Sequence, residues 1–408
     1  MTLFEELKWR GLIESVTNVE IIEKLNNDKL TFYIGTDPTA DSLHIGHFSS
    51  LLVAKRLEQH GHHPIILVGG ATGLIGDPRP TKERTMITKE ELEKNYNGLC
   101  VQIKKLFGFE MVNNYDWSKD INFIDYLRDY GKFFNISYML NKETVKSRLD
   151  GGITYTEFSY MIMQSLDFLH LFESRNCTLQ IGGQDQWGNI TSGMELIRKK
   201  TGHEVYGFTM PLITKADGTK FGKSEGGAIW LDKNKTSPYE MFQFLINSED
   251  SKVIDYLKKL TFLSKEEIDE LDNDLNNHPE LRKSHKALAK EVITFIHGQD
   301  AYYEALKISE ALFNGNIKQL NEQELLDCFN GVPTFIINEP LNIVDLLVNN
   351  DICSSKREAK EFINNGAILI NDDKIILEDM VVSEDMAIEK KIVVVRKGKK
   401  KYYLGIFN

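Results

Sequence analysis

The most constraining feature of this sequence is an alternation, between Thr31 and about Trp230, of short apolar runs with longer amphipathic segments. The runs TFYIG (31–35) and HPIILVGG (63–70) have the pattern of buried strands, each followed by a turn and then a helical pattern. CTLQIGG and GFTMPLIT repeat the theme further along the chain. This alternation predicts an α/β fold, with a Rossmann-like, doubly wound parallel sheet whose ligands bind at the carboxyl ends of its strands.

The length of the chain predicts more than one domain. Its 408 residues exceed one ordinary core. The segment SKEEIDELDNDL has the pattern of a capped amphipathic helix, while little periodicity is visible from Asn314 to Pro340, which predicts a spacer. We expect four parts: a catalytic domain at 1–235, a helical domain at 236–320, a linker at 321–340 and a small α+β domain at 341–408.

Charge and cysteine content narrow the class of protein. The net charge of -11 argues against a chain that binds nucleic acid over its whole surface. No apolar run is long enough to cross a bilayer, and MTLFEELKWR lacks the features of a secretory signal, so we expect a cytoplasmic protein without a membrane partner. The four cysteines stand far apart without CxxC spacing, so we expect no disulfide framework and no structural metal.

Two histidines flank a glycine in DPTADSLHIGH, where a predicted strand, a turn and a helix meet. Helix amino termini attract phosphate, and His44 and His47 could donate hydrogen bonds to a phosphoryl group as its charge spreads in a transition state. Metal binding is one alternative, although nothing nearby completes a ligand set. The other alternative is a histidine pair that only caps the turn.

A second polar motif, KADGTKFGKS, is a glycine-rich loop that ends with Lys220, Lys223 and Ser224. A flexible backbone, two cations and a hydroxyl suit closure over a polyphosphate. The loop is not a P-loop, because its first glycine is misplaced and no strand runs straight into it. Taken alone, it could equally be a solvated hairpin.

A polar stripe follows one face of the helix predicted in TYTEFSYMIMQSLDF. Thr154 and Glu157 predict a capping box at its start. Tyr160, Gln164 and Asp167 lie at positions i, i+4 and i+7 and share a face. A phenol, an amide and a carboxylate on an otherwise apolar helix favour a polar pocket, with a satisfied buried network as the alternative.

Taken together, these motifs resemble those of a known family. HIGH (44–47) followed by KFGKS (220–224) resembles the paired signatures of class I aminoacyl-tRNA synthetases. The stretches YIGTDPTADSLHIGH, GGATGLIGDP, FSYMIMQSLDF and QIGGQDQWGNI are similar to those of bacterial tyrosyl-tRNA synthetases, and the resemblance runs the length of the chain. It implies a tyrosine–tRNA ligase that uses ATP to convert L-tyrosine to tyrosyl-adenylate, with release of pyrophosphate. The tyrosine is then transferred to the 3′ end of tRNA(Tyr).

The resemblance assigns the tyrosine site residue by residue. Tyr33 and Asp167 would bind the phenolic hydroxyl of the substrate. The residues that would hold its ammonium group are Asp77, Tyr160 and Gln164, with Gln186 nearby. A buried donor and acceptor that phenylalanine leaves unpaired make that analogue costly to bind, and tyrosyl-tRNA synthetases are the usual example of this effect.

The resemblance also assigns the nucleotide end. His44 and His47 would act on the phosphate oxygens, while Lys220, Lys223 and Ser224 would follow the departing pyrophosphate. The ATP-binding residues would be Gly35, Asp37, Thr39, Gly46, Asp185 and Lys223, with Asp185 on the ribose. Mg²⁺ is expected to accompany ATP, although no carboxylate cage is visible.

Two stretches depart from the family pattern. KFGKS stands where the wider class favours Met and Ser in the middle, so only its flanking lysines and final serine carry over. DPRPTKERT differs in length from the family pattern. Lys82 and Arg84 are therefore assigned only in outline, to the pyrophosphate or the tRNA end.

The tail is more basic than the rest of the chain. Residues 341–408 carry eleven Lys or Arg and eleven Asp or Glu, so the remaining residues hold the whole acidic excess. A predicted helix, capped by Ser354 or Ser355, carries Lys356, Arg357 and Lys360, and the basic run KKIVVVRKGKKKYY follows. This tail resembles the RNA-binding module shared with a small-subunit ribosomal protein. It implies contact with the variable arm of tRNA, with the helical domain facing the anticodon; a solvated terminal strand is the alternative.

The family also implies a homodimer, and the aromatic segment FIDYLRDYGKFFNISYML is the expected interface. Tryptophanyl enzymes share the fold and both signatures, but a tryptophan pocket has less use for a phenol at Tyr33. Two other function classes stay open: an adenylyl-transferring enzyme without tRNA, and an inactive relative that binds RNA as a regulator. The intact histidines and lysines argue against the second.

Overall fold

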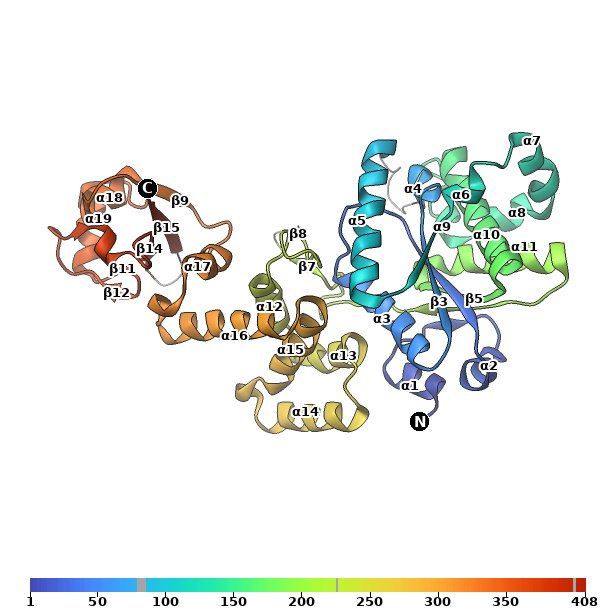
Figure 1. The fold of residues 1–408 in the computed structure, drawn as a ribbon, viewed down its shortest axis with the longest axis horizontal. Helices are drawn as coiled ribbons and strands as arrows, with labels where there is room; N and C mark the ends of the chain where they lie inside the picture. Colours follow the sequence, from blue (N-terminus) through green and yellow to red (C-terminus); the bar gives the residue numbers. More distant parts are fainter. Residues whose placement is uncertain (79–85, 225–226, 399–400) are drawn as a thin grey trace. The chain divides into compact units, whose positions relative to one another are not determined.

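A computed structural model describes residues 1–78, 86–224, 227–398 and 401–408 (Figure 1). By packing, the chain divides into two compact units. Unit 1 comprises Met1–Lys235 and Ser248–Leu288, and unit 2 comprises Thr236–Asn247 and Ala289–Asn408. These units are defined by packing alone, so the four-part functional division stays a prediction. None of the helices in the described ranges combines the length and apolarity needed to cross a membrane.

Unit 1 is built around a six-stranded sheet with the order β1-β6-β5-β2-β3-β4. Its strands are β1 (Ser15–Val16), β2 (Thr31–Thr36), β3 (His63–Val68), β4 (Glu110–Asn113), β5 (Cys177–Gly183) and β6 (Tyr206–Met210). All neighbours are parallel except β1, which is antiparallel to β6. The predicted parallel sheet is therefore confirmed. The strand order reverses between β2 and β5, and ligands of open α/β sheets bind at such a switch point.

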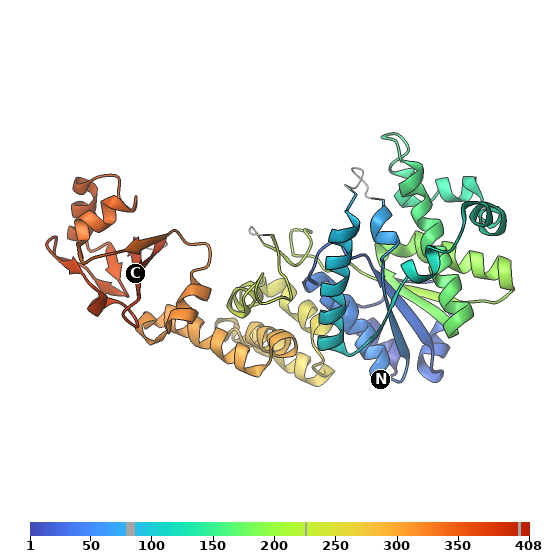
Figure 2. The same ribbon diagram turned by 45° about the horizontal axis from the view of Figure 1, so that its top comes forward.

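Helices cover both faces of this sheet, with α3 and α5 on one side and α10 and α11 on the other (Figures 1 and 2). The helices of unit 1 are α1 (Leu3–Trp9), α2 (Ile21–Asn27), α3 (Ile45–Gln59), α4 (Thr72–Ile75), α5 (Lys89–Phe107), α6 (Tyr115–Ser118), α7 (Phe123–Asp125), α8 (Ile136–Leu140), α9 (Glu143–Lys146), α10 (Tyr155–Arg175), α11 (Trp187–Thr201), α13 (Asp250–Leu260) and α14 (Lys265–Asn277). A two-stranded ribbon, β7 (Lys223–Ser224) and β8 (Gly227–Ala228), completes the unit.

Two helix starts were predicted to be capped. The cap at α14 is confirmed, and it is a full capping box, because Ser264 and Glu267 exchange both bonds. At α10 only half of the box forms: Thr154 Oγ1 accepts from the amide of Glu157. The Glu157 carboxylate instead pairs with Arg148 at 2.9 Å, both side chains being almost fully buried. The predicted reciprocal bond is wrong because a buried guanidinium competes for the carboxylate.

Unit 2 combines helices with a five-stranded sheet of order β12-β11-β14-β15-β9. Its helices are α12 (Pro238–Ile246), α16 (Gln299–Asn314), α17 (Glu322–Cys328), α18 (Ile343–Asn349) and α19 (Lys356–Asn364), while α15 (Lys283–His297) crosses the boundary between the units. Its strands are β9 (Thr334–Ile337), β10 (Leu341–Asn342), β11 (Ile368–Ile370), β12 (Asp373–Lys374), β13 (Val381–Val382), β14 (Ile392–Lys397) and β15 (Lys401–Phe407).

The segment between Asn314 and Pro340 differs from the prediction. It contains α17 and β9, and β9 pairs in parallel with β15. The predicted spacer therefore contains regular secondary structure, while its role as a linker stays a prediction. A seven-residue helix and a four-residue strand are too short for their periodicity to stand out in a sequence.

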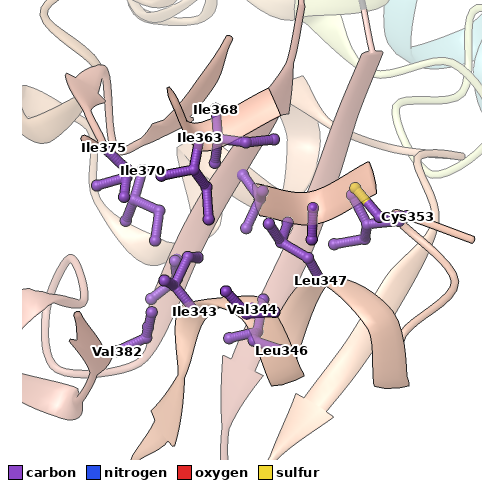
Figure 3. Close-up of a cluster of buried hydrophobic side chains, with 14 of the residues drawn as sticks. Ile343, Val344, Leu346, Leu347, Cys353, Ile363, Ile368, Ile370, Ile375 and Val382 are labelled. Carbon is purple, nitrogen blue, oxygen red and sulfur yellow. The ribbon is translucent and has the colours of Figure 1, made fainter. Parts of the chain in front are cut away.

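The C-terminal part of unit 2 has its own apolar core (Figure 3). Ile343 and Leu347 from α18 and Ile363 from α19 meet Ile368 and Ile370 from β11. All five side chains are at most 1 % exposed. This part of the chain therefore has a sizeable core of its own.

Candidate active site

A buried phenol lies in the central strand of unit 1. Tyr33, in β2, is 1 % exposed, and its ring centroid is 5.3 Å from that of Phe168. Its hydroxyl is buried without a hydrogen-bond partner in the described part of the chain. Burial and the nearby charge of Asp167 raise the pKa of Tyr33 well above its usual value. The phenol is therefore protonated and retains its capacity to hydrogen-bond a ligand.

The carboxylate of Asp167, in α10, is held in place by two donors. Asn114 Nδ2 and Trp117 Nε1 each donate to it at 2.9 Å. Burial raises the pKa of Asp167 to about 7, although both hydrogen bonds act in the opposite direction. The carboxylate therefore has a fixed orientation before any ligand binds.

A chain of hydrogen bonds links this aspartate to the other end of the polar stripe. Tyr160 Oη donates to Asp37 at 2.9 Å, and Thr72 Oγ1 donates to the same carboxylate at 2.8 Å. Asn114 Nδ2 in turn donates to Thr72 Oγ1 and to Asp167. The predicted face of α10 therefore lies over the carboxyl end of β2. Gln164 is half-buried between its two neighbours on that face.

A third carboxylate, Asp77, follows α4. Gln186 Nε2 donates to it at 2.7 Å and Asn189 Nδ2 at 3.4 Å. Burial, reinforced by the charges of Asp37 and Asp185, raises the pKa of Asp77 to about 6. Carboxylates that raise one another's pKa in a buried site favour a positively charged group between them.

Glycine keeps this network close to the sheet. A Cβ on Gly69, directly after β3, would overlap the oxygens of Thr72 and Asp37 that form the hydrogen bond. By contrast, a Cβ on Gly35, at the end of β2, would meet no atom within 4 Å. There is therefore open space above the end of β2, beside the predicted nucleotide-binding residues. Thr39 lies there too and is exposed.

The two histidines lie at the start of α3. The amide of Gly46 donates to His44 Nδ1 at 3.1 Å, and the amide of His44 donates to His47 Nδ1 at 3.3 Å. The rings stack with centroids 3.9 Å apart. Since both Nδ1 atoms accept, each neutral ring carries its hydrogen on Nε2. Burial, and secondarily His44, lowers the pKa of His47 to about 3, so this ring is a neutral donor.

The lysine motif lies directly against the histidine motif. Gly222 has φ +91°, and a Cβ there would overlap the side chain of Ile45. The amide of Ile229 donates to Gly222 O, and the amide of Ile45 donates to Ile229 O, both at 2.9 Å. Only glycine tolerates this close approach in a left-handed conformation. The two signatures are thus joined through one short stretch of backbone.

Lys220 is exposed on its loop, and Asp185 is exposed after β5. The backbone of Lys223 and Ser224 forms β7, but the positions of their side chains lie outside the description. Lys82 and Arg84 also lie outside the described residues.

The predicted tRNA-binding cations lie on α19, which belongs to unit 2. Ser355 is the cap of that helix. Lys356 pairs with Asp345 at 2.6 Å, and Lys360 pairs with Glu378 at 2.9 Å. Arg357 is exposed and has no ion pair within the residues that the structure covers.

Sequence reasoning missed several residues that build the site. Asn114 and Trp117 follow the four-residue strand β4, which is too short to have predicted a site at its end. Gln180 in β5 lies opposite Tyr33 in register, is 2 % exposed, and has a buried Oε1 without a partner in the described chain. The available signal was a glutamine inside the largely apolar run CTLQIGG.

Comparison with known proteins adds independent information. A family model for "tRNA synthetases class I (W and Y)" matches residues 25–314, and one for the "Tyrosine--tRNA ligase SYY-like C-terminal domain" matches residues 324–405. A tyrosine–tRNA ligase from Staphylococcus carnosus is 51 % identical over 412 residues, which cover 98 % of each chain.

Solved structures agree with this match. The C-terminally truncated mitochondrial tyrosyl-tRNA synthetases of Aspergillus nidulans and Coccidioides posadasii are each 31 % identical to this chain, with TM-scores of 0.69 and 0.67. The alignments cover 76 % and 75 % of this chain and 94 % and 91 % of theirs. A tryptophanyl-tRNA synthetase from Encephalitozoon cuniculi, at 14 % identity and a TM-score of 0.55, shares the fold.

Proposed function

The chain belongs to the tyrosine–tRNA ligases of the class I aminoacyl-tRNA synthetases, and from that membership we propose which of its residues perform each part of the reaction. It is a ligase that joins tyrosine to tRNA(Tyr) with ATP as a substrate. The observation that carries the proposal is the buried phenol of Tyr33, which has no hydrogen-bond partner in the described chain and is close enough to the fixed carboxylate of Asp167 to sense its charge.

Tyr33 and Asp167 recognise the hydroxyl of the substrate. Asp167 accepts the substrate's phenolic hydrogen, and Tyr33 donates to the same oxygen. Because Asn114 and Trp117 already hold the carboxylate, little ordering is lost when tyrosine binds. Phenylalanine would leave both groups buried and unpaired.

The substrate's ammonium group lies among the buried carboxylates. Asp77 is its ionic partner, and Tyr160 and Gln164 complete its contacts from α10. Gln186 holds Asp77 in position. Burial, and less strongly the charges of Asp37 and Asp185, raises the pKa of Asp77, and a bound cation would stabilise its ionised form.

In the first step, a carboxylate oxygen of tyrosine attacks the α-phosphorus of ATP, and the bond from that phosphorus to the bridging oxygen of pyrophosphate breaks. No general base is needed, since the carboxylate is ionised at neutral pH. The Nε2–H groups of His44 and His47 donate to phosphate oxygens as charge accumulates, and the cations of Lys220 and Lys223 follow the pyrophosphate. Ser224 adds a hydroxyl donor.

The nucleotide lies above the end of β2, between the two signatures. Gly35 leaves open space there, Gly46 begins the helix whose amino terminus attracts phosphate, and Asp37 and Thr39 line the same end. Asp185 is exposed where it can accept from ribose hydroxyls. Mg²⁺ bound with ATP would neutralise part of the charge on the phosphate oxygens.

In the second step, a terminal ribose hydroxyl of tRNA(Tyr) attacks the acyl carbon and adenosine monophosphate leaves. Arg357, exposed on α19, is the side chain of unit 2 that we assign to the RNA backbone, with Lys356 and Lys360 beside it. Lys82 and Arg84 remain assigned to the pyrophosphate or the tRNA end. Residues 236–320 face the anticodon in this scheme.

A second copy of the chain completes the enzyme. Within the segment predicted as the interface, Phe123, Ile124 and Ile136 are 67 %, 64 % and 66 % exposed. Large apolar side chains exposed on a surface favour association with another protein.

All four cysteines are free, which fits our assignment of the protein to the cytoplasm.

The test is tyrosine-dependent exchange of labelled pyrophosphate into ATP, without tRNA, with tyrosine, phenylalanine and tryptophan offered separately. Efficient exchange with tyrosine, with a far lower kcat/KM for phenylalanine and no exchange with tryptophan, is the expected result. Exchange with tryptophan would overturn the roles of Tyr33 and Asp167, and the absence of exchange with any of the three would overturn the assigned catalytic roles.

A further inference from the structure

The lysine motif belongs to a hairpin. The amide of Phe221 donates to Ile213 O at 2.9 Å, and Thr214 and Lys220 form an isolated antiparallel bridge. At the tip, the amide of Gly218 donates to Lys215 O. The exposed Lys220 is thus carried on one arm of a small hairpin, whose position is set by what the hairpin packs on.

One side chain of α13 contacts both arms of this hairpin. Tyr256 is 1 % exposed, and its hydroxyl donates to Thr214 O at 3.1 Å. On the other arm, the ring of Phe221 packs against the Tyr256 ring with centroids 4.2 Å apart. Burial and neighbouring carboxylates raise the pKa of Tyr256, so its phenol stays a donor. Tyr256 is therefore the point at which α13 holds the hairpin.

A second contact holds the tip. Glu249 is the N-cap residue of α13, but its side chain makes no capping bond to its own helix. Its carboxylate instead accepts from the amide of Ala216 at 2.7 Å. Because this contact is exposed, it is weaker than the buried one at Tyr256.

The far end of α13 is fixed to the helix that begins with the histidine motif. Arg56, in α3, donates to Thr261 O, directly after α13. Arg10 donates to Lys258 O at 3.0 Å and to Leu263 O at 2.7 Å. Both guanidinium groups are almost fully buried. Helix α13 therefore contacts α3 at its C-terminal end and the lysine hairpin through Tyr256 and its N-cap residue Glu249.

We propose that Tyr256, assisted by Glu249, is a positioning residue that fixes the lysine hairpin relative to the histidines for the activation step. The contact between α13 and α3 fixes the position of α13 relative to the histidines. The hydrogen bond from Tyr256 then fixes the position of the hairpin relative to α13. This inference rests on the proposed function of Lys220. It gives α13, outside the sheet that binds both substrates, a part in the rate of adenylate formation.

The first test replaces the phenol without removing the ring. Tyr256→Phe should lower kcat for pyrophosphate exchange about fivefold, the effect of one hydrogen bond, while KM for tyrosine stays unchanged. Tyr206→Phe is the matched control, since its buried phenol bonds Glu20 rather than the hairpin. An unchanged kcat in Tyr256→Phe, or a kcat loss matched by a rise in KM for tyrosine, would overturn the proposal.

The second test asks whether Tyr256 acts through the lysine hairpin. In a background that carries Lys220→Ala, adding Tyr256→Phe should lower kcat by less than twofold, because the group being positioned is gone. A full additional fivefold loss would assign Tyr256 a different role.

A third measurement needs no catalysis. Trypsin should cleave the substrate-free Tyr256→Phe protein after Lys215 or Lys220 several-fold faster than it cleaves the Tyr206→Phe control. Suppose that Tyr256→Phe is cleaved faster but the unaltered chain shows no pyrophosphate exchange. The contact between Tyr256 and the hairpin would then be upheld, and the proposed function would be overturned. Equal cleavage rates would overturn the positioning role itself.

Discussion

The proposed tyrosine pocket and the lysine hairpin of unit 1 are built in opposite ways. In the pocket, the carboxylate of Asp167 is buried and receives two side-chain donors at 2.9 Å. On the hairpin, Lys220 is exposed, and the contacts with α13 are made by its neighbours instead. The proposed pocket is ordered before the substrate binds. In the hairpin only the backbone is held in place, and the exposed Lys220 side chain can follow the departing pyrophosphate.

This difference divides the reaction between the two regions. A preorganised pocket acts on the affinity for tyrosine and on the choice between amino acids. A cation that meets charge only as pyrophosphate departs acts on the rate of the chemical step. Substitutions in the two regions should therefore separate KM from kcat.

The largest expected effect is on the hairpin. Lys220→Ala should lower kcat for pyrophosphate exchange by about 10²–10³-fold, the usual cost of losing a group that stabilises transition-state charge. KM for tyrosine should change by less than about twofold, because the pocket is intact. Steady-state exchange kinetics with varied tyrosine measure both. If KM for tyrosine rose as much as kcat fell, the division of roles between the pocket and the hairpin would be wrong.

Two properties that depend on the pocket should change with pH in opposite directions: the free energy of unfolding and the affinity for tyrosine. Burial raises the pKa of Asp77 to about 6 and that of Asp167 to about 7, from an ordinary value of 3.8. Between pH 4 and 7, the folded ligand-free protein therefore holds protons that the unfolded chain has lost, so its free energy of unfolding falls as the pH rises. Asp167→Asn should flatten this slope in denaturant titrations.

Tyrosine affinity should move the other way. The ammonium group needs an ionised Asp77 and the phenolic hydrogen an ionised Asp167, so the affinity should fall as the pH drops below about 7, by more than about tenfold at pH 5. Equilibrium binding of tyrosine between pH 5 and 8 measures this. A pH-independent affinity would show that Asp77 is not the ionic partner.

A smaller effect is expected from the phenol. Tyr33→Phe should weaken tyrosine about tenfold in KM and leave the KM for phenylalanine nearly unchanged, because only tyrosine bonds the lost hydroxyl. Since the hydroxyl of Tyr33 has no partner in the described chain, its removal leaves no protein group unsatisfied. An equal rise in KM for tyrosine and for phenylalanine would contradict direct recognition of the substrate hydroxyl by Tyr33.

The smallest effect is expected on α19, in unit 2. Arg357→Ala should raise KM for tRNA about threefold and leave pyrophosphate exchange unchanged, because one phosphate contact is lost. Lys360→Ala is the matched control: its ammonium already pairs with Glu378, so its loss should matter less. Equal effects of the two substitutions on tRNA charging would remove the special role of Arg357.

The sequence predicted the parts of the molecule with strong local signals. Buried strands such as HPIILV and the helix that follows HIGH carry clear periodicity, and both formed where expected. Tyr160 and Asp167 were placed on one face because helical spacing alone determines it. These predictions needed no knowledge of distant contacts.

Other features depended on contacts between distant segments and could not be read locally. Asn114 and Trp117 reach Asp167 only because β4 lies at the edge of the sheet, two places from β2. The Glu157 carboxylate pairs with Arg148 instead of making the predicted capping bond. Strand β9 forms because it can pair with β15, which lies far along the chain. Tyr256 gave no signal, since an aromatic residue on an amphipathic helix is most often core.

The most direct test of the division between pocket and hairpin is the ratio of kcat/KM for tyrosine to that for phenylalanine in Lys220→Ala. Our account predicts that this ratio equals that of the unaltered chain while kcat falls by about 10²–10³-fold. A ratio that collapses together with kcat would contradict it, because the cation would then take part in choosing the amino acid.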